Sequence, residues 1–166
     1  MRRWLPHTLG LLTPLVTIAG LFLGKWWMGS TIFLALFIYP LIDFIAGKSE
    51  KVEPAKSRTQ FDFIIHAHGI LVPVVIGLLF WKVLTSPFDN FLLLGIVSVG
   101  LSSGASGIIT AHELGHRKPK SFSWWLARLD LLCVNYLHFT VEHNHTHHKH
   151  WARPVDPTTA PMGRNV

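Results

Sequence analysis

Cysteine and charge are the scarce ingredients of this 166-residue chain. Its single cysteine, Cys133, excludes an internal disulfide. Only 14% of the residues are charged and nine are acidic, whereas 49% are apolar. A typical soluble domain has about 25% charged residues, so the composition favours a protein that lies in a membrane.

The apolar residues gather in four blocks, each near the roughly 20 residues that a helix needs to cross a bilayer. The blocks cover residues 8–24, 26–46, 63–84 and 91–111. A short turn at Lys25 separates the first two, and turn-forming residues 85–90 separate the last two. We therefore expect an all-α fold, a polytopic bundle of four transmembrane helices, with residues 1–166 forming a single membrane domain.

The net charge of +6 raises the question of nucleic-acid binding, which the placement of the basic residues answers. Four alternating spans put 13 of the 15 basic residues on one face and leave only Lys25 and Lys82 near the other. By the positive-inside rule, the N-terminus and everything after residue 111 are cytoplasmic. The basic excess thus predicts membrane topology and no nucleic-acid partner.

Polar and small residues interrupt the apolar pattern at two places. Asp43, His66 and His68 lie near the predicted cytoplasmic ends of spans. Interfacial anchoring or helix–helix hydrogen bonding is the favoured interpretation, and support of a metal site is the alternative. Residues 100–107 are nearly all small, which favours close helix packing over a substrate channel.

Histidines form two clusters after the last span. His112, Glu113 and His116 make an HExxH pattern, in which two imidazoles four residues apart share one helical face. The second cluster begins at Glu142 and places five histidines in the eight positions 143–150. His143 and His147 repeat the four-residue spacing, and His148 adds a nitrogen at an adjacent angle. A solvated tract that binds metal adventitiously is the simpler alternative.

Residues 123–140 are rich in apolar and aromatic side chains and predict an interfacial or re-entrant helix that brings the two clusters together.

The number of histidines bears on the metal. Nitrogen ligands suit iron, zinc or copper. A zinc protease of the HExxH type would use His112, Glu113 and His116 and leave the second cluster idle. A dinuclear centre uses both clusters. The spacing therefore favours two metal ions held within the helical, cytoplasmic or interfacial region 112–150.

Four segments resemble the membrane-bound non-haem di-iron alkane hydroxylases, a family within the histidine-box superfamily of fatty-acid desaturases and hydroxylases. Residues 112–118 (HELGHRK) resemble the first histidine box of that family, and residues 142–148 (EHNHTHH) resemble its second. Residues 152–163 (ARPVDPTTAPMG) are similar to its Asp-Pro segment, and residues 39–48 (YPLIDFIAGK) to the end of its second span.

The resemblance implies an alkane 1-monooxygenase that hydroxylates the terminal carbon of medium-chain alkanes with O2. It implies two non-haem irons, electrons from rubredoxin and an NAD(P)H-dependent reductase, and a place in the bacterial inner membrane in contact with lipid. It also implies metal ligands, with two glutamates as acceptors for ligand N–H groups. The ligands are His112, His116, His143, His147 and His148, and the acceptors are Glu113 and Glu142.

Three alternatives remain open at this point. Related chemistry, such as that of a xylene monooxygenase or a fatty-acid desaturase, would use the same boxes. The family has a third box and a further histidine segment, whereas this sequence shows two boxes, so we expect an N-terminal fragment with an incomplete centre. An inactive membrane fragment without a complete metal site is the alternative of another class.

Overall fold

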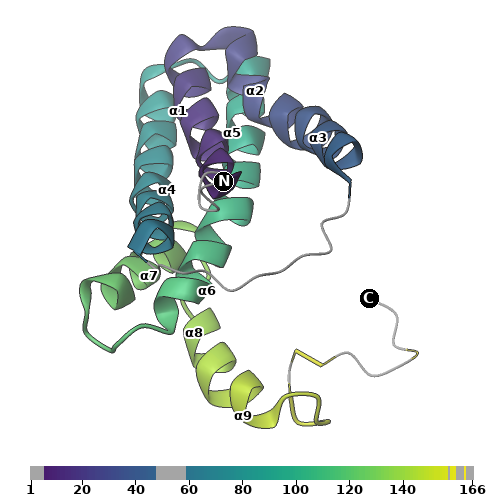
Figure 1. Ribbon diagram of the computed structural model, residues 1–166. Helices are drawn as coiled ribbons and strands as arrows, with labels where there is room; N and C mark the ends of the chain where they lie inside the picture. Colours follow the sequence, from purple (N-terminus) through teal and green to yellow (C-terminus); the bar gives the residue numbers. More distant parts are fainter. Residues whose placement is uncertain (1–5, 48–58, 157, 160–162, 164–166) are drawn as a thin grey trace.

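The computed structural model describes residues 6–47, 59–156, 158–159 and 163. Within these residues every regular element is helical. Figure 1 shows a bundle formed by α1, α2, α4 and α5, with α6 to α9 gathered at one end of it. The all-α prediction is confirmed for the described part of the chain.

Three helices are long and apolar enough to cross a membrane. They are Lys25–Ala46, Thr59–Thr85 and Asn90–Gly115. Each covers one predicted block, 26–46, 63–84 or 91–111, and extends it by at most four residues at either end. The first block, 8–24, coincides with a shorter apolar helix, His7–Leu23.

Three of the four apolar helices change between α, 3-10 and π geometry along their length. The first comprises η1 (Pro6–Leu11), a 3-10 turn, and α1 (Leu12–Leu23). The second comprises η2 (Lys25–Gly29), α2 (Ser30–Phe33), η3 (Leu34–Ile38) and α3 (Tyr39–Ala46). The third is α4 (Thr59–Thr85), and the fourth comprises α5 (Asn90–Ser102), η4 (Ser103–Ile108) and α6 (Ile109–Gly115). The segments η3 and η4 are π-helical, and η4 ends one short turn before the first histidine pair.

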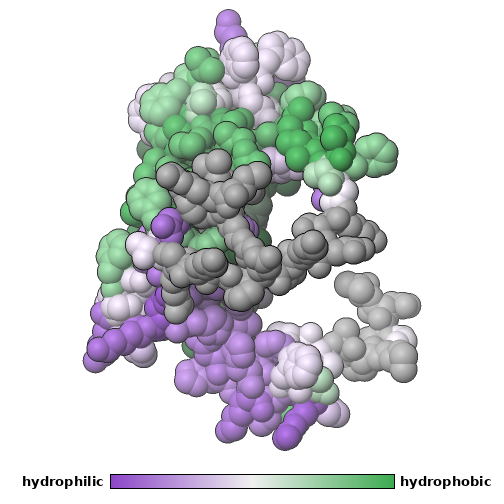
Figure 2. Space-filling view, in the orientation of Figure 1, coloured by the Kyte–Doolittle hydropathy of each residue, from purple (hydrophilic) through white to green (hydrophobic). Residues whose placement is uncertain are grey.

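The apolar residues of the bundle point both inward and outward. Inside, Leu21, Met28 and Val75 pack with Leu92 and Val99 to join α1, η2, α4 and α5. Outside, large apolar side chains such as Phe44 and Leu84 are exposed over more than four-fifths of their surface. Figure 2 shows this apolar surface over the bundle and a hydrophilic surface over the end of the molecule that holds α6 to α9. Such a distribution matches a bundle surrounded by lipid, with one end in water.

The helix α7 (Phe122–Cys133) is shorter than the predicted 123–140 helix, which is a correction. Asn135 adopts a left-handed backbone conformation, with φ of 56°. The amide of Asn135 donates to the carbonyl of Leu132, and the amide of Tyr136 donates to that of Leu131. This is the Schellman arrangement, in which asparagine tolerates the left-handed residue that ends a helix.

Two features singled out in the sequence, His66 and the small-residue stretch 100–107, have structural roles. His66 donates from Nδ1 to its own helix at the Asp62 carbonyl and contacts Ser123 Oγ through Nε2 at 2.8 Å. This links α4 to α7 and confirms helix–helix hydrogen bonding for His66. In the small-residue stretch, Gly107 packs closely, because a Cβ there would lie 2.9 Å from Val134 Cγ1. Ala105 and Ser106 instead line a cavity of about 530 Å³.

Candidate metal centre

The first histidine pair lies at the end of α6, with His112 in its last turn and His116 as its C-cap. His112 and His116 are four residues apart, and their ring centroids are 4.9 Å apart. The helix is anchored by Ala111 and Leu114, which are fully buried against Ala127 and Leu131 of α7. Because the apolar residues of α6 face the core, its histidines face the opposite side, towards the second cluster.

The second cluster lies on a continuous short helix. It comprises α8 (Phe139–Val141), the π-helical η5 (Glu142–His147) and α9 (His148–His150). A π-helix bonds position i to i+5, so it brings His148 as well as His147 beside His143. The Nε2 atoms of His143 and His148 lie 3.0 Å apart. Single π turns occur often at functional sites.

The two helices bring four histidines into one cluster. Ring centroids lie 4.5 Å apart for His112 and His143 and 5.0 Å apart for His116 and His148. One nitrogen from each of the four lies within 4.8 Å of all the others. We call His112, His116, His143 and His148 the four-histidine cluster.

The donor set of this cluster fits a metal ion. Two bare imidazole nitrogens 3.0 Å apart, as in His143 and His148, repel each other unless a proton or a cation lies between them. A separation of about 3 Å is also that of two ligands at right angles around an ion about 2.1 Å from each. Nitrogen donors of this kind suit iron, zinc or copper.

The surroundings disfavour the protonated forms of two of the four histidines, His143 and His116. Burial and the neighbouring imidazoles lower the pKa of His143 to about 4. Burial, followed by the charges of His112 and His148, lowers the pKa of His116 as well. The neutral imidazole is the form that binds metals, so these two shifts favour the binding form of His116 and His143.

The other predicted site residues lie around the cluster. Glu113 Oε1 accepts a hydrogen bond from His112 Nδ1 at 3.1 Å, whereas Glu142 is exposed at the start of η5. His147 lies outside the four-histidine cluster, although its ring centroid is 5.4 Å from that of His143. Nδ1 of His147 faces Asp156 Oδ2 at 3.0 Å.

Asp156 is a residue to which our interpretation of the sequence gave no role. It is 3% exposed and accepts hydrogen bonds from the amide and hydroxyl of Thr158 and the hydroxyl of Thr159. Burial would raise its pKa, but the hydrogen bonds from Thr159, Thr158 and His147 outweigh burial and hold the pKa well below the usual range. An aspartate that bonds the backbone two residues on is a recognisable turn pattern, so the Asp-Pro-Thr-Thr run carried a usable signal.

An apolar cavity approaches the cluster from the bundle. It has a volume of about 530 Å³ and lies between η1, α4 and the end of the last long helix. Its lining includes Ile109 and Thr110, which lie three and two residues before His112 on the same helix, together with Ile64, Ile65 and Tyr39. A hydrophobic molecule could thus be accommodated close to the histidines.

These features define a helical membrane protein that carries a histidine cluster with the donor set of a metal centre. Comparison with known proteins shows what the chain is similar to: it matches alkane 1-monooxygenases along nearly its whole length. Alkane 1-monooxygenase 1 of Alcanivorax borkumensis is 34% identical over 95% of this chain. The alkane 1-monooxygenases of Pseudomonas putida and Ectopseudomonas oleovorans are 30% and 31% identical over 98% of it.

The chain spans 42% of the length of each of these three relatives. No protein-family model matches it, and no solved structure matches it significantly. The resemblance inferred from the histidine motifs is therefore confirmed by relatives that share most of this chain.

Proposed function

We propose that this chain is the part of a di-iron monooxygenase that carries its first two histidine boxes, and that the enzyme hydroxylates the terminal carbon of medium-chain alkanes. The observation that carries the proposal is the four-histidine cluster, which unites the two motifs shared with the family. The homologues are named alkane 1-monooxygenases, which supports alkane hydroxylation over xylene oxidation or desaturation.

The proposed ligands of two non-haem irons are the four-histidine cluster and His147. Bound iron would supply the redox chemistry that activates O2, with electrons from rubredoxin and an NAD(P)H-dependent reductase. The chain itself presents imidazoles for this purpose and directs them with acceptors. Glu113 is such an acceptor for His112, and Glu142 is proposed to act similarly. The apolar cavity that Ile109 and Thr110 line is proposed to bind the alkane.

We also propose that all four apolar helices lie in the bacterial inner membrane as a single membrane domain. Helix α1 supports this, because Leu21 is buried in the same core as the long helices α4 and α5. The predicted face with 13 of the 15 basic residues supports a cytoplasmic N-terminus and cytoplasmic histidines. A soluble electron donor would then reach the metal centre without crossing the bilayer.

Iron binding tests the proposal. The chain is purified in detergent, titrated with Fe(II) under anaerobic conditions and assayed for bound iron. We expect His112→Ala to remove most of the bound iron, because it deletes one of the four clustered donors. His138→Ala is the matched control, since His138 is exposed and its ring contacts Tyr136 instead of the cluster. Equal iron content in both variants would contradict the proposed centre.

Product analysis tests the substrate. Membranes that contain the whole enzyme, of which this chain is the proposed part, are supplied with octane, labelled O2, rubredoxin, reductase and NADH. The proposal expects 1-octanol carrying one labelled oxygen atom. An unsaturated product would favour the desaturase alternative instead.

A further inference from the structure

The chain after the second histidine cluster folds back onto that cluster. The amide of Arg153 donates to the carbonyl of His150, and the amide of Asp156 donates to the carbonyl of Arg153. These two turns bring the Asp156 carboxylate beside η5, where it is almost completely buried. Burial of a carboxylate is costly unless donors surround it.

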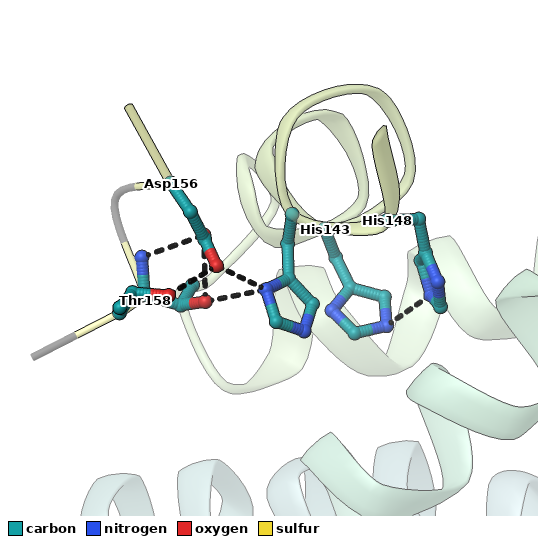
Figure 3. Close-up of polar contacts among 6 residues, drawn as sticks. His143, His148, Asp156 and Thr158 are labelled. Carbon is teal, nitrogen blue, oxygen red and sulfur yellow. Dashed lines mark hydrogen bonds and ion pairs between the residues drawn. The ribbon is translucent and has the colours of Figure 1, made fainter. Parts of the chain in front are cut away.

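Four donors surround this carboxylate. Oδ1 accepts from the Thr158 amide at 3.0 Å and from the Thr158 hydroxyl at 2.8 Å. Oδ2 accepts from the Thr159 hydroxyl at 2.6 Å and lies 3.0 Å from His147 Nδ1. Figure 3 shows Asp156 and Thr158 together on one side of the histidines, with His148 on the other. Both oxygens are therefore fixed in place, and one of them is directed at His147.

This network determines which nitrogen of His147 carries the proton. The Thr158 hydroxyl lies 2.6 Å from Nδ1 and gives its proton to Asp156 Oδ1, so its oxygen is free to accept. Nδ1 thus faces two acceptors, Thr158 Oγ1 and Asp156 Oδ2. A bare Nδ1 would oppose the carboxylate lone pair, whereas a protonated Nδ1 satisfies both contacts. The protonated Nδ1 leaves the lone pair on Nε2.

We propose that Asp156 is a positioning residue that, together with Thr158, holds His147 in the tautomer whose Nε2 binds a metal ion beside the four-histidine cluster. The inference rests on the proposed function and assigns His147 a different place from that of its neighbours in the motif. His143 and His148 converge with their Nε2 atoms 3.0 Å apart, whereas His147 is turned to Asp156. The second motif is thereby divided between two adjacent metal positions.

A carboxylate in this position does two things for a ligand. It fixes the orientation of the imidazole ring, and it raises the basicity of the ligating nitrogen. Loss of such a partner typically weakens metal binding by about 10-fold to 100-fold. The ring of His147 lies 5.4 Å from that of His143 and 5.7 Å from that of His148, so small rotations would alter the relation between the two positions.

Asp156→Asn tests this assignment most directly. If the amide oxygen of asparagine stays towards the Thr158 amide, its NH2 group meets Nδ1 and moves the His147 proton to Nε2. If the amide is flipped, the NH2 group opposes the donors of Thr158 instead. Either arrangement breaks part of the network. Thr158→Val is the second variant, because it removes one acceptor from Nδ1 and leaves the carboxylate in place.

The probe is Co(II), added to the full chain in detergent and competed with a chelator, with the visible absorption of bound Co(II) as a spectroscopic signature. We expect Asp156→Asn to weaken one class of Co(II) site by about 10-fold to 100-fold, and Thr158→Val to weaken it less. Asp89→Asn is the matched control, because Asp89 caps α5 in the turn after α4 and asparagine caps equally well. Co(II) affinity equal to that of this control would overturn the role of Asp156.

Nitrogen NMR of the metal-free chain with labelled histidine provides a readout that is independent of metal loading. The proposal expects His147 to carry its proton on Nδ1 and Asp156→Asn to shift protonation towards Nε2. Unchanged His147 resonances in that variant would overturn the assignment.

His112→Ala separates this inference from the proposed function. Loss of Co(II) binding in His112→Ala but not in Asp156→Asn would leave the metal centre intact and remove only the role of Asp156. Binding that is insensitive to both substitutions would overturn both.

Discussion

Two buried aspartates in this molecule have opposite surroundings. Asp156, in the loop after α9, is held by four hydrogen-bond donors. Asp130, on α7, is fully buried, and neither of its carboxyl oxygens has a partner among the described residues. Burial raises the pKa of Asp130 to about 8, whereas the hydrogen bonds of Asp156 overcome burial and lower its pKa. For these two carboxyl groups, the number of hydrogen-bond donors separates the two directions of the pKa shift.

The two environments also differ in what covers them. Asp130 lies where α7 packs on α4, close to Gly69 and Leu126. Asp156 lies under threonine hydroxyls that belong to its own turn. The first carboxyl is thus covered by apolar groups that cannot donate, and the second by residues that can.

The largest expected effect comes from removing the proton site at Asp130. Its pKa rises from 3.8 unfolded to about 8 folded, so the folded state binds the extra proton between these values. The free energy of unfolding therefore falls as pH rises from about 4 to about 8. Asp130→Asn keeps the shape and removes the proton, so above pH 8 it should be more stable than the parent by on the order of a few kcal/mol.

Unfolding in detergent, followed by tryptophan fluorescence between pH 5 and pH 9, measures this difference. Asp89→Asn serves as the control for the change from aspartate to asparagine, because Asp89 is exposed and asparagine caps α5 equally well. Parallel curves for the parent and Asp130→Asn would show that Asp130 is charged in the folded state and would remove the contrast with Asp156.

A smaller effect is expected from crowding the Asp130 environment. In Gly69→Ala the new Cβ would lie 2.9 Å from Leu126 Cδ2 and 3.1 Å from Asp130 Oδ2. Because helix α7 must move to make room, we expect a loss of about 1–3 kcal/mol in the free energy of unfolding.

Gly77→Ala is the control on the same helix. No atom lies within 4 Å of the position of its Cβ, and alanine favours a helix over glycine by about 1 kcal/mol. Thermal unfolding should therefore occur at a lower temperature in Gly69→Ala and at an equal or higher temperature in Gly77→Ala. Equal shifts in the two variants would mean that α4 and α7 are not tightly packed around Asp130.

The long helices could be predicted because their signal is local. Apolar runs of about 20 residues define them, and Lys25–Ala46, Thr59–Thr85 and Asn90–Gly115 agree with the predicted blocks within four residues. The end of α7 was missed, since the apolar pattern continues past Cys133 while the left-handed Asn135 ends the helix. Periodicity detects a buried face but not a single backbone conformation.

The histidine centre could be predicted only in part for a similar reason. Ligand identity follows from residue type and spacing, and four of the five predicted ligands do come together. Their metal binding stays a prediction. The pairing of His143 with His148 depends on a π-helical turn, which spacing alone does not indicate. Asp130 and Asp156 show the same limit of prediction from sequence. Both are aspartates, but packing that is visible only in three dimensions shifts their pKa values in opposite directions.

The smallest expected effect comes from removing one donor at Asp156. Thr159→Val deletes the hydroxyl that donates to Oδ2 at 2.6 Å, while both Thr158 donors and His147 remain. One hydrogen bond contributes about 1 kcal/mol, so the turn should open more readily and the Thr158 amide should exchange about fivefold faster. Thr85→Val is the control, because its hydroxyl donates to a carbonyl of its own helix and is exposed. An exchange rate at Thr158 no faster than in that control would mean that the carboxylate of Asp156 does not need all four of its donors. The opposite pKa shifts of Asp156 and Asp130 would then arise from fewer hydrogen bonds than the structure shows.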